Sequence, residues 1–536
     1  MTGTAPDVGD VDTPAIEPLS PDRRRTGLWF VAAVAVVAVL ALVTVPDQIR
    51  FALYPQDEGL LLAYPSLLLK GWVPNRGFES VYGTVNLWVL AGSFKLLGAS
   101  VAVERMVGLA YRLVVIGSLM TLAVRRRGPG AALCAGVTSI VIMAGTIGLA
   151  AFGWIAGVAF VGLGLALADV GLATGRRRWT VASAGLCFGL ALGCRLDLVV
   201  AVGLLLAVIV LLRPTSRVPL AAGLLVGLVP LALNLVQAGP AAVLRQQVLT
   251  PIFVTGPSRR LPLGTLGWQS VILLVLCGGI GVALLVFGAR EVRRDRSQWN
   301  GILMMATGLL DLGLIPEAVQ RSDMAHLALV ACWVVPSAVL LPPLIWANRK
   351  RRETPVTVFN ALPPAVALVG LLLIGSSSGR IYWSSLPVVG TPASEFVVAH
   401  GDRSVPVPSA ESRAELEQLL AAVDAHSRNG QRLFVGPMDL STAGYADTYL
   451  YYLLPELPPA TRYLEMDPGV SNGAGSTLAS ELRSADLLIL NSAYDNFPDA
   501  DPSTRHGSQA PNQVVNSYFE PVASAGTWTL YDRRTP

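Results

Sequence analysis

The sequence predicts an α-helical polytopic membrane protein with a C-terminal α/β domain outside the bilayer. Of its 536 residues, 53% are hydrophobic and only 14% are charged, whereas about a quarter of the residues of a soluble protein are charged. Apolar runs long enough to cross a bilayer recur through the first two thirds of the chain. The region 379–536 is polar instead, and it alternates strand-like and helix-like runs.

About eleven apolar runs approach or meet the length that a transmembrane helix needs. They lie at 28–45, 102–123, 131–149, 152–173, 180–194, 197–212, 218–236, 268–289, 299–316, 326–346 and 359–376. Every dense basic cluster then falls on the side of the N-terminus: Arg125–Arg127, Arg176–Arg178, Arg213 with Arg217, Arg290–Arg296 and Arg349–Arg352. The positive-inside rule therefore predicts a cytoplasmic N-terminus and an extracytoplasmic C-terminal domain.

Three regions follow from this count. Residues 1–26 form a disordered cytoplasmic tail, 27–378 a transmembrane domain with a long outer loop at 47–101, and 379–536 the extracytoplasmic domain. In the last region, strands are expected at 432–435 and 485–490. Helices are expected at 409–426, with Ser409 as N-cap, and at 477–483. The net charge of only +4 gives no reason to expect nucleic acid, and the five cysteines lie in apolar runs, as free core residues do.

The outer loop begins with two adjacent acids, Asp57 and Glu58, before a helix-like stretch at 60–70. A second such stretch, 81–97, includes Tyr82 at the level of the lipid headgroups. Acids at a helix N-terminus complement the helix dipole, which is one interpretation of the pair. The other is that the pair takes part in chemistry at the membrane face.

Three further groups of charges lie on the predicted outer side. Arg195 and Asp197 are flanked by apolar residues, where an ionisable group usually faces a cavity or pairs with its neighbour. Arg321, Asp323 and His326 open the tenth run, where the histidine is either structural or a ligand for an anion or a metal. Arg259 and Arg260 occupy a long loop at 237–267, either as solvated charges or as ligands for a lipid phosphate.

Together these groups suit glycosyl transfer from a polyprenyl-phosphate sugar. A carboxylate can remove the proton of an acceptor hydroxyl, and guanidinium groups can stabilise the phosphate as it leaves. The apolar spans would hold the lipid part of such a donor.

The sequence resembles the GT-C superfamily of integral-membrane glycosyltransferases, in particular its bacterial protein-mannosyltransferase-like (glycosyltransferase family 39-like) branch. The resemblance rests on Asp57-Glu58-Gly59 with the loop that follows, on Gly193-Cys-Arg195-Leu-Asp197, and on Gln320-Arg321-Ser-Asp323-Met-Ala-His326. It implies that Asp57 is the catalytic base and that Glu58 helps to position the substrate or a metal ion.

The resemblance also implies that Arg195, Arg321, Arg259 and Arg260 contact the donor phosphate. Residue type and position on the outer face add further candidate substrate-binding residues: Glu79, Tyr82, Asp197, Asp323 and His326. Many relatives have an acid at the position of Gly77, so Glu79, two residues on, is the substitute to test. No cofactor is expected with certainty, although some relatives hold a divalent metal. The segment from Tyr449 to Tyr463 resembles appended domains of bacterial members, and its tyrosines belong either to an acceptor site or to a core.

These observations predict an inverting glycosyltransferase in the plasma membrane of a bacterium. Its expected partners are a polyprenyl-phosphate sugar, a glycan, lipid or protein acceptor of the cell envelope, and membrane lipids. The alternative is a transporter or a flippase for lipid-linked sugars. Transporters usually place ionisable groups near the bilayer midplane within internal repeats, whereas here the charges lie at the outer ends of the spans.

Overall fold

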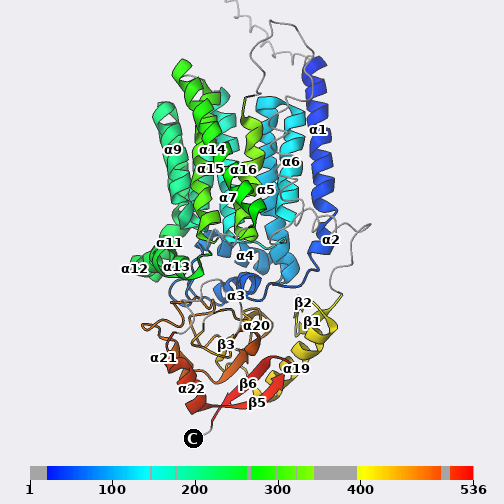
Figure 1. The fold of residues 1–536 in the computed structure, drawn as a ribbon, viewed down its shortest axis with the longest axis vertical. Coiled ribbons are helices and arrows are strands. Elements are labelled where there is room, and N and C mark those ends of the chain that lie inside the picture. The colour runs from blue at the N-terminus through cyan, green and yellow to red at the C-terminus, as the bar shows by residue number, and fades with distance from the viewer. Residues whose placement is uncertain are drawn as a thin grey trace, which may run out of the picture.

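The computed structural model describes residues 21–144, 148–174, 178–261, 267–296, 298–321, 323–342, 395–442, 444–495 and 507–534. Within these residues a bundle of long helices adjoins a smaller domain that contains the strands, and short helices lie at the junction (Figure 1). The architecture agrees with the predicted helical membrane protein with a C-terminal α/β domain.

The long helices of the bundle are amphipathic only weakly, because apolar residues cover most of their surface. They are α1 (Pro21–Leu42), α5 (Val101–Arg127), α6 (Pro129–Ala144), α7 (Gly153–Thr174), α8 (Arg178–Cys194), α9 (Val199–Leu212), α10 (Arg217–Gly227), α14 (Trp268–Arg294), α15 (Trp299–Gln320) and α16 (Met324–Ser337). Close packing of α8 on α10 depends on glycine, since a Cβ on Gly185 or Gly223 would lie about 2 Å from a carbonyl oxygen of the other helix.

Most of the predicted spans are confirmed as helices of the bundle. Each of the first ten predicted runs coincides with a helix or with two consecutive helices, but in the described part of the chain five helices are long and apolar enough to cross a membrane, or six if a pair bent by 117° counts as one. Helix α9, for example, has 14 residues and is about 21 Å long, less than the hydrocarbon core of a bilayer. The eleventh run, 359–376, lies outside the described residues.

Short helices lie between the bundle and the C-terminal domain. Helices α2 (Val45–Gln48), α3 (Asp57–Leu69) and α4 (Thr84–Leu97) occupy the outer loop, and the two predicted helices of that loop are confirmed as α3 and α4. The segment predicted as a long loop from 237 is instead largely helical. It continues from α11 (Val229–Ala238) through α12 (Pro240–Leu244), two π-helical turns (Arg245–Leu249 and Pro251–Thr255) and α13 (Gly256–Arg259).

The C-terminal domain has a small mixed sheet with strand order β3-β4-β6-β5, in which β3 and β4 are parallel. The strands are β3 (Leu433–Pro437), β4 (Leu487–Asn491), β5 (Phe519–Ala525) and β6 (Trp528–Arg533), beside a hairpin of β1 (Val397–His400) and β2 (Arg403–Pro406). Helices α19 (Ala410–His426), α20 (Leu450–Leu453), α21 (Leu478–Leu482) and α22 (Ala510–Tyr518) accompany them. The strand predictions at 432–435 and 485–490 are confirmed. So is the Ser409 cap, whose Oγ accepts a hydrogen bond from the Ser412 amide at 3.1 Å.

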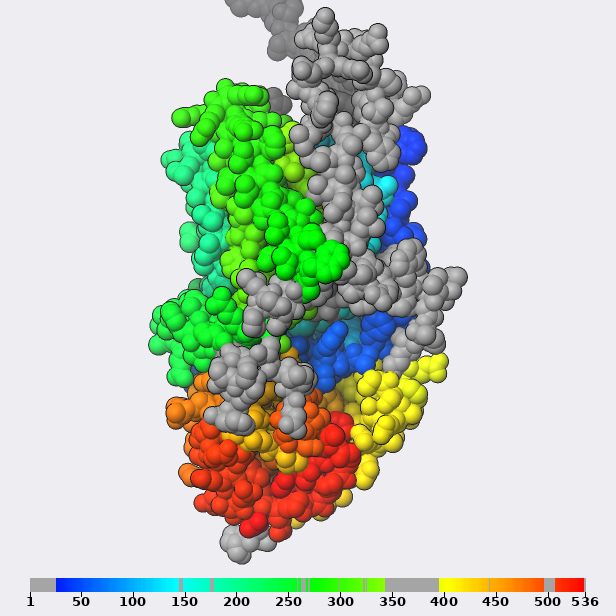
Figure 2. Space-filling model, viewed as in Figure 1, coloured from blue at the N-terminus to red at the C-terminus, as the bar shows by residue number. Residues whose placement is uncertain are grey.

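The outer loop and the C-terminal domain share one hydrophobic core. Side chains of α3 such as Leu60 and Tyr64 belong to the same buried cluster as Leu433 of β3 and Leu487 of β4. The space-filling view shows the outer-loop residues, coloured blue, directly above the yellow and orange residues of the domain (Figure 2). Because the two regions bury apolar surface against each other, the domain holds the N-terminus of α3 in place.

The tyrosines between 449 and 463 belong to this protein interior. Tyr449, Tyr451, Tyr452 and Tyr463 are each at most 6% exposed, and the hydroxyl of Tyr452 donates to the carbonyl oxygen of Ala99 in the loop before α5, at 3.1 Å. The interpretation of these tyrosines as core residues is confirmed. All five cysteines are free, and four of them are buried.

Candidate active site

A cavity of about 240 Å³ lies where the helix bundle meets the C-terminal domain. Seven of the residues singled out in the sequence line it: Asp57, Tyr82, Arg195, Asp197, Arg259, Arg321 and His326. They come from the start of α3, the loop before α4, the turn after α8, the end of α13 and the junction of α15 with α16. Segments that are far apart in the sequence therefore place carboxylate and guanidinium groups side by side in the lining of one cavity.

At the start of α3, four consecutive residues, 56–59, each contact a different part of the protein. Gln56 is fully buried, and its Oε1 accepts a hydrogen bond from the amide of Ala446 in the C-terminal domain at 2.9 Å. Gly59 lies so close to that domain that a Cβ would be 2.5 Å from the amide nitrogen of Tyr449. Glu58 points into the bundle, and Asp57 lines the cavity. Both acids lie in the first turn of α3, as the helix-dipole interpretation expects.

The pKa of the Asp57 carboxyl is raised above its ordinary value, chiefly because burial disfavours the charged form. The positive charges of Arg259, Arg321 and His326 oppose this shift. A carboxylate with a raised pKa is a stronger base than an exposed aspartate.

Glu58 lies outside the cavity lining and is 1% exposed. Arg105 of α5 forms a bidentate ion pair with it, with Nε to Oε1 at 2.6 Å and Nη2 to Oε2 at 2.8 Å. The remaining nitrogen of Arg105 donates to the backbone carbonyls of Gln48, Ile49 and Phe51. Glu58 thereby fastens the N-terminus of α3 to α5 and to the end of α2.

Arg195 follows the C-terminus of α8 and lies between aromatic rings and carboxylates. Its guanidinium carbon is 5.8 Å from the ring centroid of Tyr82 and 5.7 Å from that of Trp154, within the range of cation–π attraction. The Arg195–Asp197 pair considered from the sequence is formed, with Nε to Oδ2 at 3.0 Å. A second carboxylate, that of Glu317 on α15, lies 3.6 Å from Nη2. Arg195 is therefore fixed in orientation while it still lines the cavity.

Asp323 organises the junction of α15 and α16. Its Oδ1 accepts from the amide of His326, which caps α16, and lies 2.8 Å from His326 Nδ1, while its Oδ2 is 2.9 Å from Arg321 Nε. Burial alone would raise the pKa of Asp323, but the hydrogen bonds and charge of His326, together with Arg321, lower it to about 2. Asp323 does not line the cavity itself. It holds Arg321 and His326, which do.

The two adjacent arginines at the end of α13, Arg259 and Arg260, have different surroundings. Arg259 lines the cavity and pairs with Asp467 of the C-terminal domain, with Nη2 to Oδ1 at 2.5 Å. The same Nη2 donates to the carbonyl oxygen of Met466 at 3.2 Å. Arg260, in contrast, is exposed and is absent from the cavity lining.

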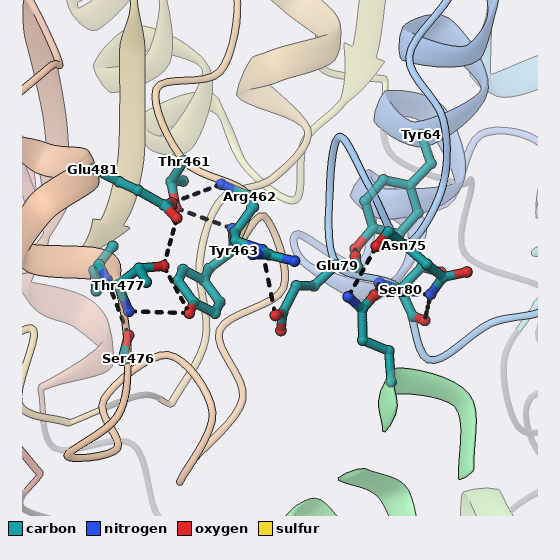
Figure 3. Close-up of polar contacts among 12 residues, drawn as sticks. Tyr64, Asn75, Glu79, Ser80, Thr461, Arg462, Tyr463, Ser476, Thr477 and Glu481 are labelled. Carbon is teal, nitrogen blue, oxygen red and sulfur yellow. Dashed lines mark hydrogen bonds and ion pairs between the residues drawn. The ribbon is translucent and has the colours of Figure 1, made fainter. Parts of the chain in front are cut away.

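Glu79 lies beside the main cavity, in a much smaller one that shares Val81, Glu465 and Asp467 with it. Its carboxylate is 3.4 Å from Arg462 Nε, and its amide donates to the Arg462 carbonyl oxygen at 2.9 Å (Figure 3). Burial raises the pKa of Glu79, and Arg462 opposes that shift. Gly77 follows a turn in which Asn75 adopts a φ of 65°. Glu79 thus links the outer loop to the C-terminal domain next to the site.

Searches of solved structures return proteins that match almost the whole chain. ArnT from Cupriavidus metallidurans in the apo state is 16% identical, with 95% of this chain and 98% of that one covered and a TM-score of 0.54. The same protein bound to undecaprenyl phosphate is 13% identical, with 94% and 98% covered and a TM-score of 0.52. The chain has the GT-C fold. The archaeal oligosaccharyltransferase AglB from Archaeoglobus fulgidus matches at 10% identity over 94% of this chain and 74% of that one, with a TM-score of 0.46. No family model and no curated protein matches the chain.

Several residues that line the cavity were not identified from the sequence: Gln247, Glu317, Tyr445, Glu465 and Asp467. Glu317 lies one residue beyond the predicted ninth span and four before Arg321. The high cost of an ionisable group at a membrane face could have identified it. Glu465 and Asp467 had no such signal, because only the docking of the C-terminal domain brings them to the GT-C bundle.

A metal ion has no evident site in the described part of the chain, where no group of three or more histidine, cysteine, aspartate or glutamate side chains is arranged to hold one. The oxygen ligands that a hard divalent cation prefers are present in the cavity, but most are paired with guanidinium groups. The cationic side chains that line this cavity are those of Arg195, Arg259 and Arg321, beside His326.

Proposed function

We propose that this protein transfers a sugar from a polyprenyl-phosphate donor to a hydroxyl group of a cell-envelope acceptor, with inversion at the anomeric carbon. The observation that supports this best is the placement of Asp57 in one cavity with Arg195, Arg259, Arg321 and His326. The same-fold protein ArnT has been solved with undecaprenyl phosphate, a ligand of the class proposed here as the donor's leaving group.

The reaction needs one base and one leaving-group site. The Asp57 carboxylate removes the proton of the acceptor hydroxyl while the acceptor oxygen forms a bond to the anomeric carbon. The bond from that carbon to the phosphate oxygen breaks, and the polyprenyl phosphate leaves with the electron pair. A single displacement of this kind inverts the configuration. The raised pKa of Asp57 matches a base that must accept a proton in the transition state.

The guanidinium groups of Arg195 and Arg321 supply the positive charge for the phosphate. Each is held by a carboxylate, Asp197 and Asp323 respectively, so its orientation is fixed before the donor binds. Fixed charges of this kind stabilise developing negative charge without reorganising during the reaction. In this scheme Glu58 has no contact with the substrate. It positions Asp57 through Arg105.

The chemistry is proposed to take place at the extracytoplasmic face. The cavity adjoins the C-terminal domain, whereas Arg125, Arg126 and Arg127 end the 27-residue helix α5. That end lies about 40 Å from the start of the helix, which contacts the domain. If those arginines face the cytoplasm, as the positive-inside rule expects, the cavity and the C-terminal domain face outward.

The direct test is Asp57→Asn in the purified full-length chain, reconstituted in proteoliposomes with a polyprenyl-phosphate sugar and an envelope acceptor fraction. Transfer should fall by about 10²- to 10⁴-fold, the usual contribution of a positioned base. Asp402→Asn, the same change on an exposed turn between β1 and β2, should leave transfer unchanged. Normal transfer by Asp57→Asn would refute the assigned base. Movement of the lipid-linked sugar across the bilayer without any glycosylated product would favour the flippase alternative.

A further inference from the structure

Some of the charged side chains that line the cavity form ion pairs, and others do not. Arg195 pairs with Asp197 and Glu317, and Arg259 pairs with Asp467. Among the described residues, two carboxylates that line the cavity have no ion pair: Asp57 and Glu465. The proposed reaction uses one of them as the base. The second, Glu465, is contributed by the C-terminal domain and has no part in that scheme.

Glu465 belongs to a segment that is fastened on both sides. Before it, the hydroxyl of Thr461 and the amide of Arg462 both donate to the carboxylate of Glu481, at 2.8 and 2.9 Å (Figure 3). After it, the amide of Met466 lies 3.4 Å from Gln56 Oε1, and the Met466 carbonyl oxygen accepts from Arg259 at 3.2 Å. The backbone at Glu465 is thus fixed between the C-terminal domain and the start of α3.

The side chains along this segment alternate between the interior and the cavity. Leu464 and Met466 are buried at 0% and 1% exposure, while Glu465 and Asp467 line both the main cavity and the smaller one beside Glu79. Asp467 is engaged by Arg259. The one hydrogen-bond contact found for the Glu465 carboxylate in the described structure is the hydroxyl of Tyr82, at 3.5 Å, which is at the outer limit for such a bond.

A buried carboxyl group needs hydrogen-bond partners, and a bound ligand can supply those that the surrounding residues of the cavity do not. Burial and the neighbouring Asp467 and Asp57 raise the pKa of Glu465 well above its ordinary value. In the protonated form this group can donate one hydrogen bond and accept others. A sugar hydroxyl, which also donates and accepts, is a suitable partner, whereas a purely apolar group is not.

We infer that Glu465 is an acceptor-binding residue, and that the acceptor is a carbohydrate that presents one hydroxyl to Asp57 and another to Glu465. This inference rests on the proposed glycosyl transfer and names the acceptor class for the same site. The donor phosphate is held by the bundle, through Arg195 and Arg321, and the acceptor is held by the C-terminal domain. The appended domain therefore selects the acceptor, and a protein or simple lipid hydroxyl lacks the second contact.

The experiment uses the full-length chain in nanodiscs with a polyprenyl-phosphate sugar as donor. The acceptors are an alkyl glycoside, its monodeoxy analogues, hexanol and a serine-containing peptide. For the wild type we expect transfer to the glycoside and a KM that rises about tenfold or more for one of the deoxy analogues, the loss expected for a hydrogen bond to a carboxyl group. Glu465→Ala, which removes both the donor and the acceptor, should raise the KM for the parent glycoside by a similar factor. The same deoxy analogue should then show no further loss.

Two measurements separate a role in binding from a loss of structure. Glu465→Ala should bind undecaprenyl phosphate with an affinity within about twofold of the wild type, because the proposed phosphate ligands are untouched. Glu520→Ala, the same change on an exposed position of β5, should alter neither constant. If Glu465→Ala weakens undecaprenyl-phosphate binding, or leaves the KM of every glycoside unchanged, the acceptor assignment is wrong.

The same experiment distinguishes this inference from the proposed function. Efficient transfer to hexanol or to the peptide, with no preference for glycosides, would overturn the carbohydrate acceptor but would leave glycosyl transfer in place. Transfer to none of the acceptors, with no binding of undecaprenyl phosphate, would overturn the proposed function itself.

Discussion

Two neighbouring side chains at the start of α3, Asp57 and Glu58, belong to regions with opposite properties. Glu58 enters a closed polar cluster with Arg105, in which both carboxylate oxygens and all three guanidinium nitrogens have partners. Asp57 faces a cavity of about 240 Å³, in which it has no ion pair among the described residues. The two acids are consecutive residues, but successive side chains of a helix point about 100° apart, so the two reach different environments.

The comparison shows that charge near a membrane face does not by itself indicate a reaction. The Glu58–Arg105 pair has ideal geometry and no space beside it, so it can contribute only to structure. The Asp57 region combines open volume, fixed cations and unpaired carboxylates, which are the features that a polar substrate requires. The following predictions test that division.

The largest effect on folding is expected for Glu58→Ala. Removing one member of a buried ion pair leaves Arg105 charged and uncompensated, which should lower the free energy of unfolding by about 3–5 kcal/mol. Chemical unfolding of the purified protein measures this loss, and Glu520→Ala on the exposed surface should show almost none. Transfer per folded molecule should stay within about fivefold of wild type. Full stability combined with abolished transfer would place Glu58 in the chemistry and contradict the division.

Arg195→Lys should weaken binding of undecaprenyl phosphate by about tenfold. Lysine keeps the charge but loses the planar fork that Asp197 orients and that lies over the Tyr82 and Trp154 rings. Arg260→Lys is the matched control, because Arg260 is exposed and outside the cavity lining. Native mass spectrometry of both variants with the lipid gives the comparison. Equal losses in the two variants would mean that the phosphate does not enter this cavity.

Gly59→Ala should loosen the contact between α3 and the C-terminal domain. The added Cβ would lie 2.5 Å from the Tyr449 amide nitrogen, and backbone must shift to admit it, at a cost of about 1–3 kcal/mol. Hydrogen exchange should increase around residues 446–449, and transfer should fall. Gly92→Ala in α4, where no atom lies within 4 Å of the new Cβ, should have neither effect. An unchanged exchange pattern in Gly59→Ala would show that the domain is held elsewhere.

The smallest effect concerns pH. Asp57 must be ionised to act as a base, and its pKa is raised by burial, so kcat/KM should decline with falling pH at a point above the ordinary aspartate range. Asp323, with a pKa of about 2, stays ionised throughout and adds no second decline there. A profile of kcat/KM between pH 4 and 8, about the range in which such groups titrate, measures this limb. A profile that is flat down to the ordinary pKa of aspartate would contradict the environment described for Asp57.

Local patterns in the sequence were sufficient to predict many helices and strands of the fold. Helix α3 with its two acids, helix α19 with its Ser409 cap, and strands β3 and β4 were all predicted because periodicity, capping residues and β-branched runs act within a few residues. The predicted run 218–236 is divided between α10 and α11, since hydropathy does not reveal where a helix breaks inside a packed bundle. Strands β5 and β6 were missed because they depend on long-range pairing, of β6 with β4 and of β5 with β6.

The site was predictable in part for the same reason. Seven of its residues were found because ionisable groups are conspicuous among apolar spans. The sequence could not show which of Asp57 and Glu58 faces the cavity, because this depends on the position of Arg105 across the helix pair. It also gave no sign of Glu465, whose place in the cavity depends on the docking of a domain some 400 residues from Asp57 along the chain.

The most direct test of this account is an experimental structure of the full-length protein with undecaprenyl phosphate. The account predicts phosphate oxygens within hydrogen-bond distance, about 3 Å, of Arg195 or Arg321, with the Asp57 carboxylate facing the same cavity and Glu58 still paired with Arg105. A phosphate bound at the opposite end of the bundle, beside Arg125–Arg127, or one that contacts Glu58 through a bound cation, would contradict it.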